Sequence, residues 1–350
     1  MARLSQLKLA MATSIFIAAF IFGAFLFAIL YIIEADALTS LVIGLTGVGL
    51  FILFQYLIGP AVVASTTRLH FLKPGENPWL ESMVRELCDK SGLPMPKLAI
   101  APNDTPNAFT FGRTSKSAVL ALHEGLLRRL TKDEIKGVVA HELGHIKHKD
   151  YIVMTVLSAL PMIAYLIAQF TLRAGMITAS AGRRRNKEDN TGAALIVIGV
   201  IAFIVYIISF LSVMRLSRLR EHYADAYAAY LTGSPRSLAS ALSKITYGLS
   251  ISPKPTEGAR AFYIEDPATA KREIQQVMKS KQEYDLDKDG VLDEHELELA
   301  MEKEANDLWA TMNSWFATHP PTFKRILLLR EIENEMASGR YTSDRVYAQV

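Results

Sequence analysis

Four long stretches without a charged side chain constrain the fold of this chain more than any other feature. They lie at residues 10 to 33, 38 to 64, 151 to 172 and 193 to 214. Each is long enough for a helix to cross a bilayer, which takes about 20 predominantly apolar residues. The mean hydropathy of the whole chain is also positive, at +0.19. We therefore predict a mainly α integral membrane protein with four apolar membrane helices.

The first stretch has a competing interpretation as a cleaved signal peptide, because Arg3 and Lys8 precede it and Ala35-Asp36-Ala37 follows it. Its apolar run is longer than the roughly 7 to 15 residues of a signal-peptide core, and a second span follows at once. We therefore predict an uncleaved anchor. In the third stretch, Pro161 is expected to kink the helix.

The charges beside the four stretches only partly fix the orientation. An even number of spans places the N terminus, residues 65 to 150 and everything after residue 215 on one side. Basic residues flank the membrane on that side: Arg3, Lys8, Arg68, Arg215, Arg218 and Arg220. Because basic residues favour the cytoplasmic side, we expect that side to be cytoplasmic. The cluster Arg183 to Lys187 falls on the other side, so the last two stretches could instead form a hairpin that does not cross completely.

The sequence His141-Glu142-Leu143-Gly144-His145 carries a specific chemical signal. A helix is expected to begin just before it, because Thr131 and Glu134 have the spacing of a capping box. Positions four apart in a helix lie on one face, so the two imidazoles can hold one tetrahedral metal ion, Zn²⁺. Glu142 lies beside the first ligand, where its carboxylate can reach a water molecule instead of the metal. The alternative is a chance occurrence of two histidines and a glutamate.

A second acidic pair follows the fourth apolar stretch. Glu221 and Asp225 lie one turn apart on a predicted helix and therefore share a face. The third and fourth stretches form an out-and-back pair that returns the chain to the side of the His141 helix. Glu221 could thus complete a site of two histidines and one carboxylate with the fourth position open, and Asp225 could orient a ligand imidazole. The alternative is a solvated acidic face of an amphipathic helix.

The polar segment before the metal motif predicts a helix and a small sheet. A helical pattern covers Pro78 to Ser91, and strand-like pieces follow at Lys97 to Ile100, Ala108 to Phe111 and Ser117 to Leu122. An exposed strand beside the metal helix would let an extended peptide add as a further strand. His123 ends the last strand, where a surface or capping position is expected.

A second metal motif lies at residues 285 to 296 and matches the loop of an EF-hand. Its positions 1, 3, 5, 7, 9 and 12 are the expected calcium ligands, with the backbone carbonyl serving at position 7: Asp285, Asp287, Asp289, Val291, Asp293 and Glu296. Helical runs on both sides complete a helix-loop-helix unit. We predict one Ca²⁺ site; the alternative is an acidic helix-turn-helix that folds without metal.

Composition excludes several classes of function. The formal net charge is only +3, and no run of lysine and arginine with interleaved aromatic residues indicates a nucleic-acid surface. A single cysteine, Cys88, excludes an internal disulfide framework and cysteine-based metal sites. We predict a small buried apolar residue at that position.

His319 stands before Pro320 and Pro321, so a rigid extended turn is expected around it. That turn could present the imidazole to a cleft, or the residue could simply cap the amphipathic helix that follows. The spacing alone does not separate these two interpretations.

In combination, these features resemble the HtpX-type membrane zinc metalloproteases, which are relatives of the CAAX prenyl endopeptidases. The shared order comprises the two N-terminal spans, Asn107-Ala108-Phe109, Glu124 to Leu127, the His141 to His145 motif with Asp150, two more apolar stretches, Arg220-Glu221 with Asp225, and Thr318 to Pro321. The resemblance implies a gluzincin-like α+β catalytic domain on the cytoplasmic side of the cell (inner) membrane. It also implies cleavage of misfolded or damaged membrane proteins, as part of membrane quality control and a stress response.

The same resemblance implies roles for single residues. His141, His145 and Glu221 would be the zinc ligands, and Glu142 the catalytic carboxylate. Substrate binding would fall to Asn107, Ala108 and Phe109, and His319 would face the developing oxyanion. The chain departs from the family pattern at two places. His148 occupies a position where asparagine is expected, and we predict a surface position for it. Residues 268 to 312 are predicted to form an insertion that contains the EF-hand.

The expected organisation therefore has six parts. Two transmembrane helices fill 1–64; the metalloprotease domain comprises 65–150, 215–267 and 313–350; a transmembrane or membrane-embedded hairpin fills 151–214; and the EF-hand insertion fills 268–312. The expected partners are the lipid bilayer and protein or peptide substrates, with the oligomeric state left open. A different function is a calcium-sensing membrane scaffold whose zinc site is structural or vestigial.

Overall fold

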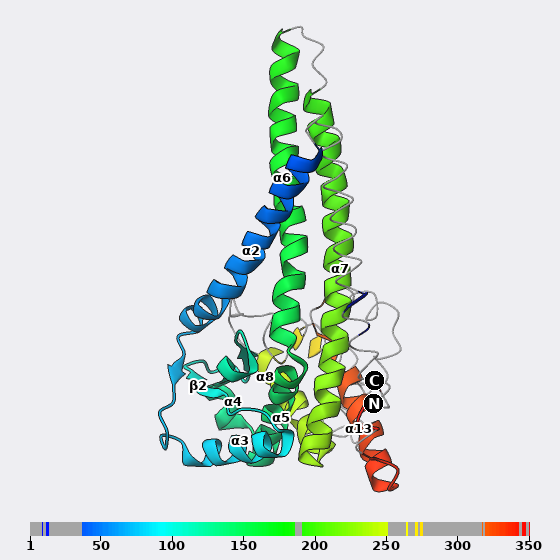
Figure 1. The fold of residues 1–350 in the computed structure, drawn as a ribbon. Coiled ribbons are helices and arrows are strands. Elements are labelled where there is room, and N and C mark those ends of the chain that lie inside the picture. The colour runs from blue at the N-terminus through cyan, green and yellow to red at the C-terminus, as the bar shows by residue number, and fades with distance from the viewer. Residues whose placement is uncertain are drawn as a thin grey trace. The chain divides into compact units, whose positions relative to one another are not determined.

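The structure is a computed structural model that describes residues 37–185, 191–250 and 319–342, with short pieces at 9, 12–13, 264, 270–271, 274–275, 317, 345–347 and 350. The chain divides into two compact units. The polar unit comprises residues 1–7, 60–151 and 217–350, and the apolar unit comprises residues 8–59 and 152–216. Figure 1 shows the elements of both.

Within the described residues, three helices are long and apolar enough to cross a membrane. They are α2 (Ala37–Thr66), α6 (Asp150–Arg185) and α7 (Thr191–Thr232). The protein is thus mainly helical with three candidate membrane helices, and the first predicted span, residues 10 to 33, lies outside the described residues. The polar residues 181 to 190 between the third and fourth stretches were expected to form a loop, and this is wrong in part, because α6 continues as helix to Arg185. Alanine and arginine are good helix formers, so nothing in that sequence ends the helix earlier.

In the apolar unit, α6 and α7 pack through small residues. Ala164, Ala168 and Ala202 are fully buried in one cluster with Val205, and small residues of this kind let two helix backbones approach closely inside a membrane. Large apolar side chains elsewhere on these helices are exposed, as Phe170 is at 74 %. Such a surface is unfavourable in water and suits contact with lipid.

The polar unit contains a four-stranded sheet in the order β1-β2-β4-β3. Its strands are β1 (His70–Phe71), β2 (Lys97–Ala101), β3 (Ala108–Phe111) and β4 (Val119–His123). The β2 and β4 strands are parallel, whereas the β1–β2 and β3–β4 pairs are antiparallel. The last strand begins two residues later than predicted, because Ser115–Ser117 form a 3₁₀ turn in which the Ser117 hydroxyl accepts the Thr114 amide.

Because β3 lies at the end of the strand order, one of its edges faces away from the sheet. The sequence predicts an exposed strand beside the metal helix without saying which one; the strand nearest to that helix in sequence, β4, lies inside the sheet, and the edge strand β3 has four buried side chains. Phe109 and Phe111 stack on one another in a cluster that includes Ala121. What β3 presents at this edge is therefore its backbone and not its side chains, and the Ala108 carbonyl there accepts the Ile264 amide at 3.1 Å.

Five helices complete the polar unit: α3 (Pro78–Ser91), α4 (Glu124–Arg129), α5 (Lys132–His148), α8 (Pro235–Ser250) and α13 (Thr322–Ala337). The bounds of α3 are those that the sequence predicts. Its start is capped by Asn77, and its end by Gly92 in the left-handed conformation that glycine adopts without strain. Cys88 is buried in this helix, as expected.

The predicted capping box starts the helix that carries the metal motif. The Glu134 amide donates to the Thr131 hydroxyl at 3.3 Å, and the Glu134 carboxylate accepts the Thr131 amide at 2.8 Å. The second carboxylate oxygen of Glu134 accepts bonds from Ser240 and Lys244 on α8, both at 2.6 Å. One side chain thus caps α5 and ties it to its neighbour.

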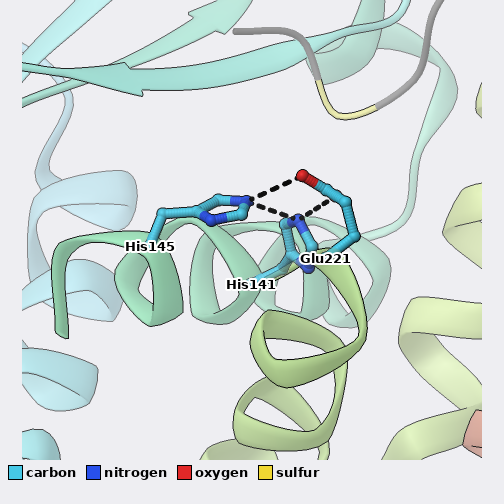
Figure 2. A group of neighbouring side chains, drawn as sticks. All are labelled: His141, His145 and Glu221. Carbon is cyan, nitrogen blue, oxygen red and sulfur yellow. Dashed lines mark hydrogen bonds and ion pairs between the residues drawn. The ribbon is translucent and has the colours of Figure 1, made fainter. Parts of the chain in front are cut away.

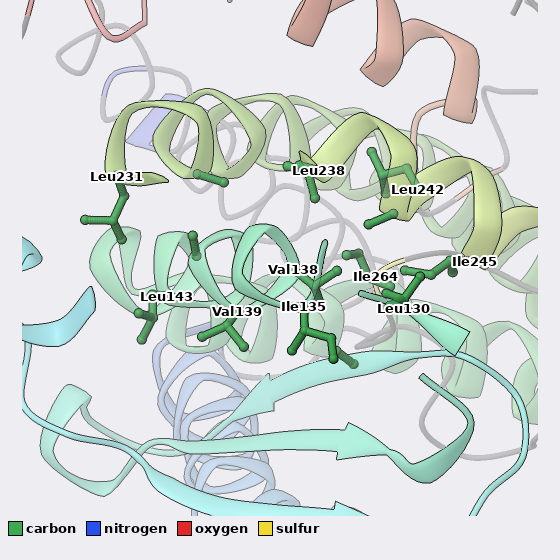
Figure 3. Close-up of a cluster of buried hydrophobic side chains, with 14 of the residues drawn as sticks. Leu130, Ile135, Val138, Val139, Leu143, Leu231, Leu238, Leu242, Ile245 and Ile264 are labelled. Carbon is green, nitrogen blue, oxygen red and sulfur yellow. The ribbon is translucent and has the colours of Figure 1, made fainter. Parts of the chain in front are cut away.

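The core of the polar unit lies between α5 and α8. Figure 3 shows apolar side chains of both helices meeting there, among them Val138 and Leu143 on α5 and Leu238 and Leu242 on α8. The two backbones approach closely at Gly137, where an added Cβ would lie 3.0 Å from the Leu238 amide nitrogen. This packing holds α5 rigidly against the rest of the unit, so the two histidines of the helix have a fixed position.

Candidate metal centre

The structure brings the three predicted metal ligands together within the polar unit. One donor atom each from His141, His145 and Glu221 lies within 4.8 Å of the other two. Figure 2 shows the two imidazoles on consecutive turns of α5 and the carboxylate on α7, all directed at one point. Glu221 is buried, so the alternative of a solvated acidic face does not apply.

The spacing of these donor atoms fits a tetrahedral zinc ion. The Nε2 atoms of His141 and His145 are 3.1 Å apart, and the carboxylate oxygens of Glu221 lie 3.4 Å from the first and 3.5 Å from the second. Tetrahedral coordination at about 2.0–2.1 Å places ligand atoms about 3.3 Å apart. Oε2 of Glu221 is also buried, and among the described residues it lies 3.4 Å from Nε2 of His141 and 3.5 Å from Nη2 of Arg325.

Close packing of α5 on the end of α7 is what brings Glu221 to the histidines. Gly144 faces Ala224 so closely that an added Cβ would lie 3.1 Å from the Ala224 Cα atom. Ala224 follows Glu221 by three residues, so both lie on one side of α7. The glycine inside the motif is therefore needed for the approach of two helices.

Asp225 holds His141 in place. Its Oδ1 atom lies 2.8 Å from the Nδ1 atom of His141, which leaves Nε2 directed at the cluster. Arg325, on α13, pairs with the same carboxylate through two hydrogen bonds of 2.8 and 2.9 Å. A carboxylate behind a ligand histidine fixes its ring orientation and tautomer. The placement predicted for Asp225 is thus observed, and Arg325 is a component that sequence analysis missed.

His145 has a corresponding pair of partners. Its Nδ1 atom lies 2.6 Å from Oδ2 of Asp150, and the other oxygen of Asp150 forms a buried ion pair with Arg220. Lys149 adopts the left-handed conformation at φ 59°, which ends α5 and lets α6 begin at Asp150. Sequence analysis assigned no role in the site to Asp150 or Arg220, which it named as part of a family pattern. The position of an acidic residue directly after the motif helix is the feature that could have indicated the contact of Asp150 with His145.

Glu142 is buried beside the two ligand histidines, whose charges act on its carboxyl group, as does the Thr110 hydroxyl. Neither of its oxygens has a hydrogen-bond partner within the described part of the chain. Burial raises the pKa of this carboxyl, and the negative charge of Glu221 acts in the same direction. A basic group with a raised pKa and unused lone pairs is suited to accept a proton at neutral pH.

The two ligand histidines bind protons more tightly than an ordinary histidine when no metal is present. Burial alone would lower the pKa of His141, but hydrogen bonds to Asp225 and Glu221 outweigh it and raise that pKa to about 9. For His145, burial is likewise outweighed by the charge of Glu221 and the bond to Asp150, so its pKa is raised. Zinc must displace these protons, and its affinity should therefore fall as the solution becomes more acidic.

The structure places His319 at the edge of the metal cluster. The residue is buried, and its Nε2 atom lies 3.8 Å from Oε1 of Glu221. The following helix, α13, begins after Pro321 without a side-chain cap. Of the two interpretations of its spacing, presentation of the imidazole to the site is the one that the geometry matches.

The three residues that the family resemblance assigns to substrate are all buried. The Asn107 side chain and the Ala108 carbonyl both accept a hydrogen bond from the amide of Ile264, at 3.0 and 3.1 Å. Phe109 contacts the ring of His123 edge to face. The group bound there is thus a residue of the protein itself, Ile264, for which the sequence predicted no role.

Two histidines with an expected surface or capping position are more enclosed than expected: His123 is buried and His148 is half-buried. His123 occupies the N-cap position of α4, but its side chain makes no cap hydrogen bond; the ring is buried, and its Nδ1 atom bonds the Thr105 carbonyl at 2.9 Å. Burial lowers the pKa of His123 to about 4. His148 packs against Tyr223, Tyr227 and Tyr347 and hydrogen-bonds the last of them at 2.8 Å. Aromatic neighbours from distant parts of the chain cover both rings, which local sequence does not reveal.

The EF-hand loop lies outside the described residues, as does most of the predicted insertion. Its calcium ligands, Asp285, Asp287, Asp289, Val291, Asp293 and Glu296, therefore remain a prediction from sequence.

Comparison with known proteins places the site in context. The sequence model described as peptidase family M48 matches residues 74–333. Protease HtpX homolog of Aeropyrum pernix is 33 % identical over 291 residues, covering 81 % of this chain and 84 % of that protein. Protease HtpX homolog 2 of Methanosarcina mazei is 32 % identical over 325 residues, covering 91 % and 95 %. Among solved structures, the crystal structure of S. mikatae Ste24p aligns with a TM-score of 0.45 and 20 % identity, over 94 % of this chain and 65 % of that chain.

Proposed function

Because the chain belongs to peptidase family M48 and is a metalloendopeptidase, we propose that it is a membrane-bound zinc endopeptidase that cleaves misfolded or membrane-associated proteins at the cytoplasmic face of the cell membrane. The observation that carries the proposal is the tetrahedral spacing of three donor atoms beside a buried, unpaired carboxylate. Peptide hydrolysis needs both components in one place. A role in membrane quality control under stress belongs to the same proposal.

The residues of the site divide the chemistry between them. His141, His145 and Glu221 would hold the zinc, which when bound polarises a carbonyl group and lowers the pKa of a water molecule. A carboxylate oxygen of Glu142 takes a proton from the attacking water and later passes it to the departing amine. His319, at the edge of the cluster, donates a hydrogen bond to the developing oxyanion.

Asp225 and Asp150 act through the ligands and do not touch the substrate. Each carboxylate fixes one imidazole by its Nδ1 atom, so that Nε2 keeps its direction when a proton or a metal is exchanged. The buried arginines behind them, Arg325 and Arg220, form ion pairs with Asp225 and Asp150 respectively and supply a neighbouring positive charge to each carboxylate.

Chain connectivity supports substrates that are anchored in the membrane or lie close to it. Glu221 belongs to the same continuous helix, α7, as the apolar residues 193 to 214, and α6 begins at Asp150, immediately before another apolar stretch. We propose that extended segments of membrane proteins reach the cluster from the membrane surface. The lipid bilayer is then a partner of the enzyme as well as its location.

A calcium-sensing scaffold with a structural zinc site is the competing function. A closed structural site has four protein ligands, whereas a catalytic site has three and an open position. The described residues contribute three donors to the cluster: His141, His145 and Glu221. This count favours the enzyme.

Zinc removal tests the proposed function. Purified protein in detergent that has been stripped of zinc with a chelator should no longer cleave an unfolded reporter protein or a membrane-tethered reporter. One equivalent of zinc per chain should restore cleavage, because only the metal completes the three-ligand site. His145→Ala should retain neither zinc nor activity, whereas the exposed His70→Ala should retain both. Cleavage by verified zinc-free protein would refute the proposal, and a zinc-loaded protein that cleaves neither reporter would favour the scaffold.

We further propose that residues 285 to 296 bind one Ca²⁺ and that this modulates cleavage. The support is the match of six ligand positions to the EF-hand pattern. Calorimetric titration should show one calcium site in the wild-type protein and none in Asp285→Ala, because that change removes a ligand at the first loop position. Cleavage in chelated and millimolar calcium should then differ for the wild type but not for the variant. A wild-type protein that binds no calcium would contradict the proposed binding. Cleavage by the wild type that is independent of calcium would contradict the proposed modulation.

A further inference from the structure

The backbone just before His319 is held by an arginine of α7. The Nη1 atom of Arg218 donates a hydrogen bond of 2.9 Å to the carbonyl oxygen of Ala317. Ala317 is buried and lies two residues before His319, which is also buried. Arg218 and Ala317 are 99 positions apart in the chain. This bond therefore joins α7 directly to the segment that leads to His319.

The same part of α7 also supplies a residue of the metal cluster. Arg218 precedes Glu221 by three positions, so both lie on one side of this helix. The Oε1 atom of Glu221 lies 3.8 Å from the Nε2 atom of His319. One turn of α7 thus binds the backbone before His319 through Arg218 and lies beside the imidazole through Glu221. The helix that supplies a cluster residue therefore also fixes the backbone that carries the imidazole.

The chain after His319 is held by separate contacts. The two prolines that follow it are buried, and each fixes its own φ angle. The Thr322 hydroxyl, at the start of α13, lies 2.9 Å from the Thr246 hydroxyl of α8, and both residues are fully buried. The position of His319 is thus set from its C-terminal side by α8 and α13, and Arg218 holds it from the N-terminal side.

The role proposed for His319 depends on its position. A donor stabilises a developing oxyanion only if it lies about 2.7–3.1 Å from the place where that oxygen forms. A displacement of about 1 Å in a site of this kind can lower the rate about 10²-fold. A guanidinium is suited to hold a carbonyl in place, because its donors are charged and fixed in a planar fork.

We propose that Arg218 is a positioning residue for His319 and acts through the Ala317 carbonyl. By holding this carbonyl, Arg218 keeps the His319 imidazole at the place where the oxyanion forms, and it does not itself touch the substrate. Sequence analysis named Arg218 only among the basic residues beside the membrane. The inference rests on the proposed function, because it concerns the oxyanion at the same metal centre.

A double-mutant cycle on the binding of a transition-state analogue tests the proposal. The probe is a phosphinic peptide with the sequence around the bond that the protein cleaves in the unfolded reporter. Its tetrahedral phosphorus group stands in for the reacting carbonyl, so its affinity reports the oxyanion donors without turnover. The dissociation constant is measured on zinc-loaded protein in detergent for the wild type, the single variants Arg218→Met and His319→Ala, and the double variant.

The expected losses are not additive. His319→Ala should weaken binding of the probe about 10²-fold, the loss typical of one oxyanion donor. Arg218→Met should weaken it about tenfold or more, and the double variant should bind no more weakly than His319→Ala, since Arg218 acts through that imidazole. All four proteins should keep their zinc. The control Arg215→Met, at an exposed arginine one turn earlier on α7, should bind the probe as the wild type does.

Two results would overturn the positioning role. One is wild-type affinity of Arg218→Met beside a loss of affinity in His319→Ala. The other is a double variant whose loss equals the product of the two single losses, because Arg218 would then act independently of His319. Wild-type affinity of His319→Ala would instead refute the oxyanion role in the proposed function, and the inference with it.

Hydrogen exchange of the zinc-free protein provides a readout that needs neither metal nor probe. Residues 317 to 319 should exchange faster in Arg218→Met than in the wild type, whereas α5 should keep its protection, because only the contact with Ala317 is lost. Unchanged exchange in this segment would contradict anchoring by Arg218. If Arg218→Met does not fold, Arg218→Gln takes its place in both experiments, because its side chain is polar but shorter than that of arginine.

Discussion

Replacing Glu142 with glutamine is expected to reduce peptide cleavage by about 10²–10⁴-fold, the contribution typical of a positioned general base. The amide cannot accept the proton of the attacking water, although it fills the same buried space. Zinc should remain bound, because His141, His145 and Glu221 form the metal cluster without Glu142. The measurement is the rate of cleavage of an unfolded reporter by protein whose zinc content has been determined.

The matched control for this experiment is Glu221→Gln. That change removes a charged donor from the cluster, so both zinc content and cleavage should fall. If Glu142→Gln loses activity but keeps zinc, and Glu221→Gln loses both, then Glu142 is the proton acceptor and Glu221 is the metal ligand. A Glu142→Gln protein that cleaves at the wild-type rate would exclude this residue from the mechanism.

Replacing Arg325 with methionine is expected to cause the largest loss of stability among single substitutions at the site. The arginine is fully buried, at 0 % exposure, and its two bonds to Asp225 neutralise a carboxylate that is also fully buried. Removing one partner of a buried ion pair leaves an uncompensated charge and typically costs about 3–5 kcal/mol. The melting temperature in detergent should fall on the order of 10 °C.

The control for this prediction lies on the same helix. Lys324 is only partly buried, so Lys324→Met should change the melting temperature by little. In the double variant Arg325→Met with Asp225→Asn, neither charge remains, and part of the lost stability should return. Arg325→Met protein as stable as the wild type would show that another group compensates Asp225.

The sequence by itself determined the features that depend on residues within one or two turns of each other. The capping box at Thr131 and Glu134 predicts where α5 begins, and the spacing of His141 and His145 predicts that their rings share a face. The apolar stretches predict the helices α2, α6 and α7 in the same way, because their length and composition alone make them compatible with a bilayer. The strand β3 was predicted with its observed bounds, whereas its place at the edge of the sheet was not predicted.

Only the tertiary structure decided which distant residues complete the site. Arg325 is 100 positions from Asp225, and Ile264 is 157 positions from Asn107. No periodicity relates such pairs; they meet because α5, α7, α8 and α13 pack around one core. The burial of His123 and the partial burial of His148 were missed for the same reason. The local sequence pattern determines which side chains share one face of a helix or strand. Which other element packs against that face depends on close contacts such as that of Gly144 with Ala224, and these form only when the whole chain folds.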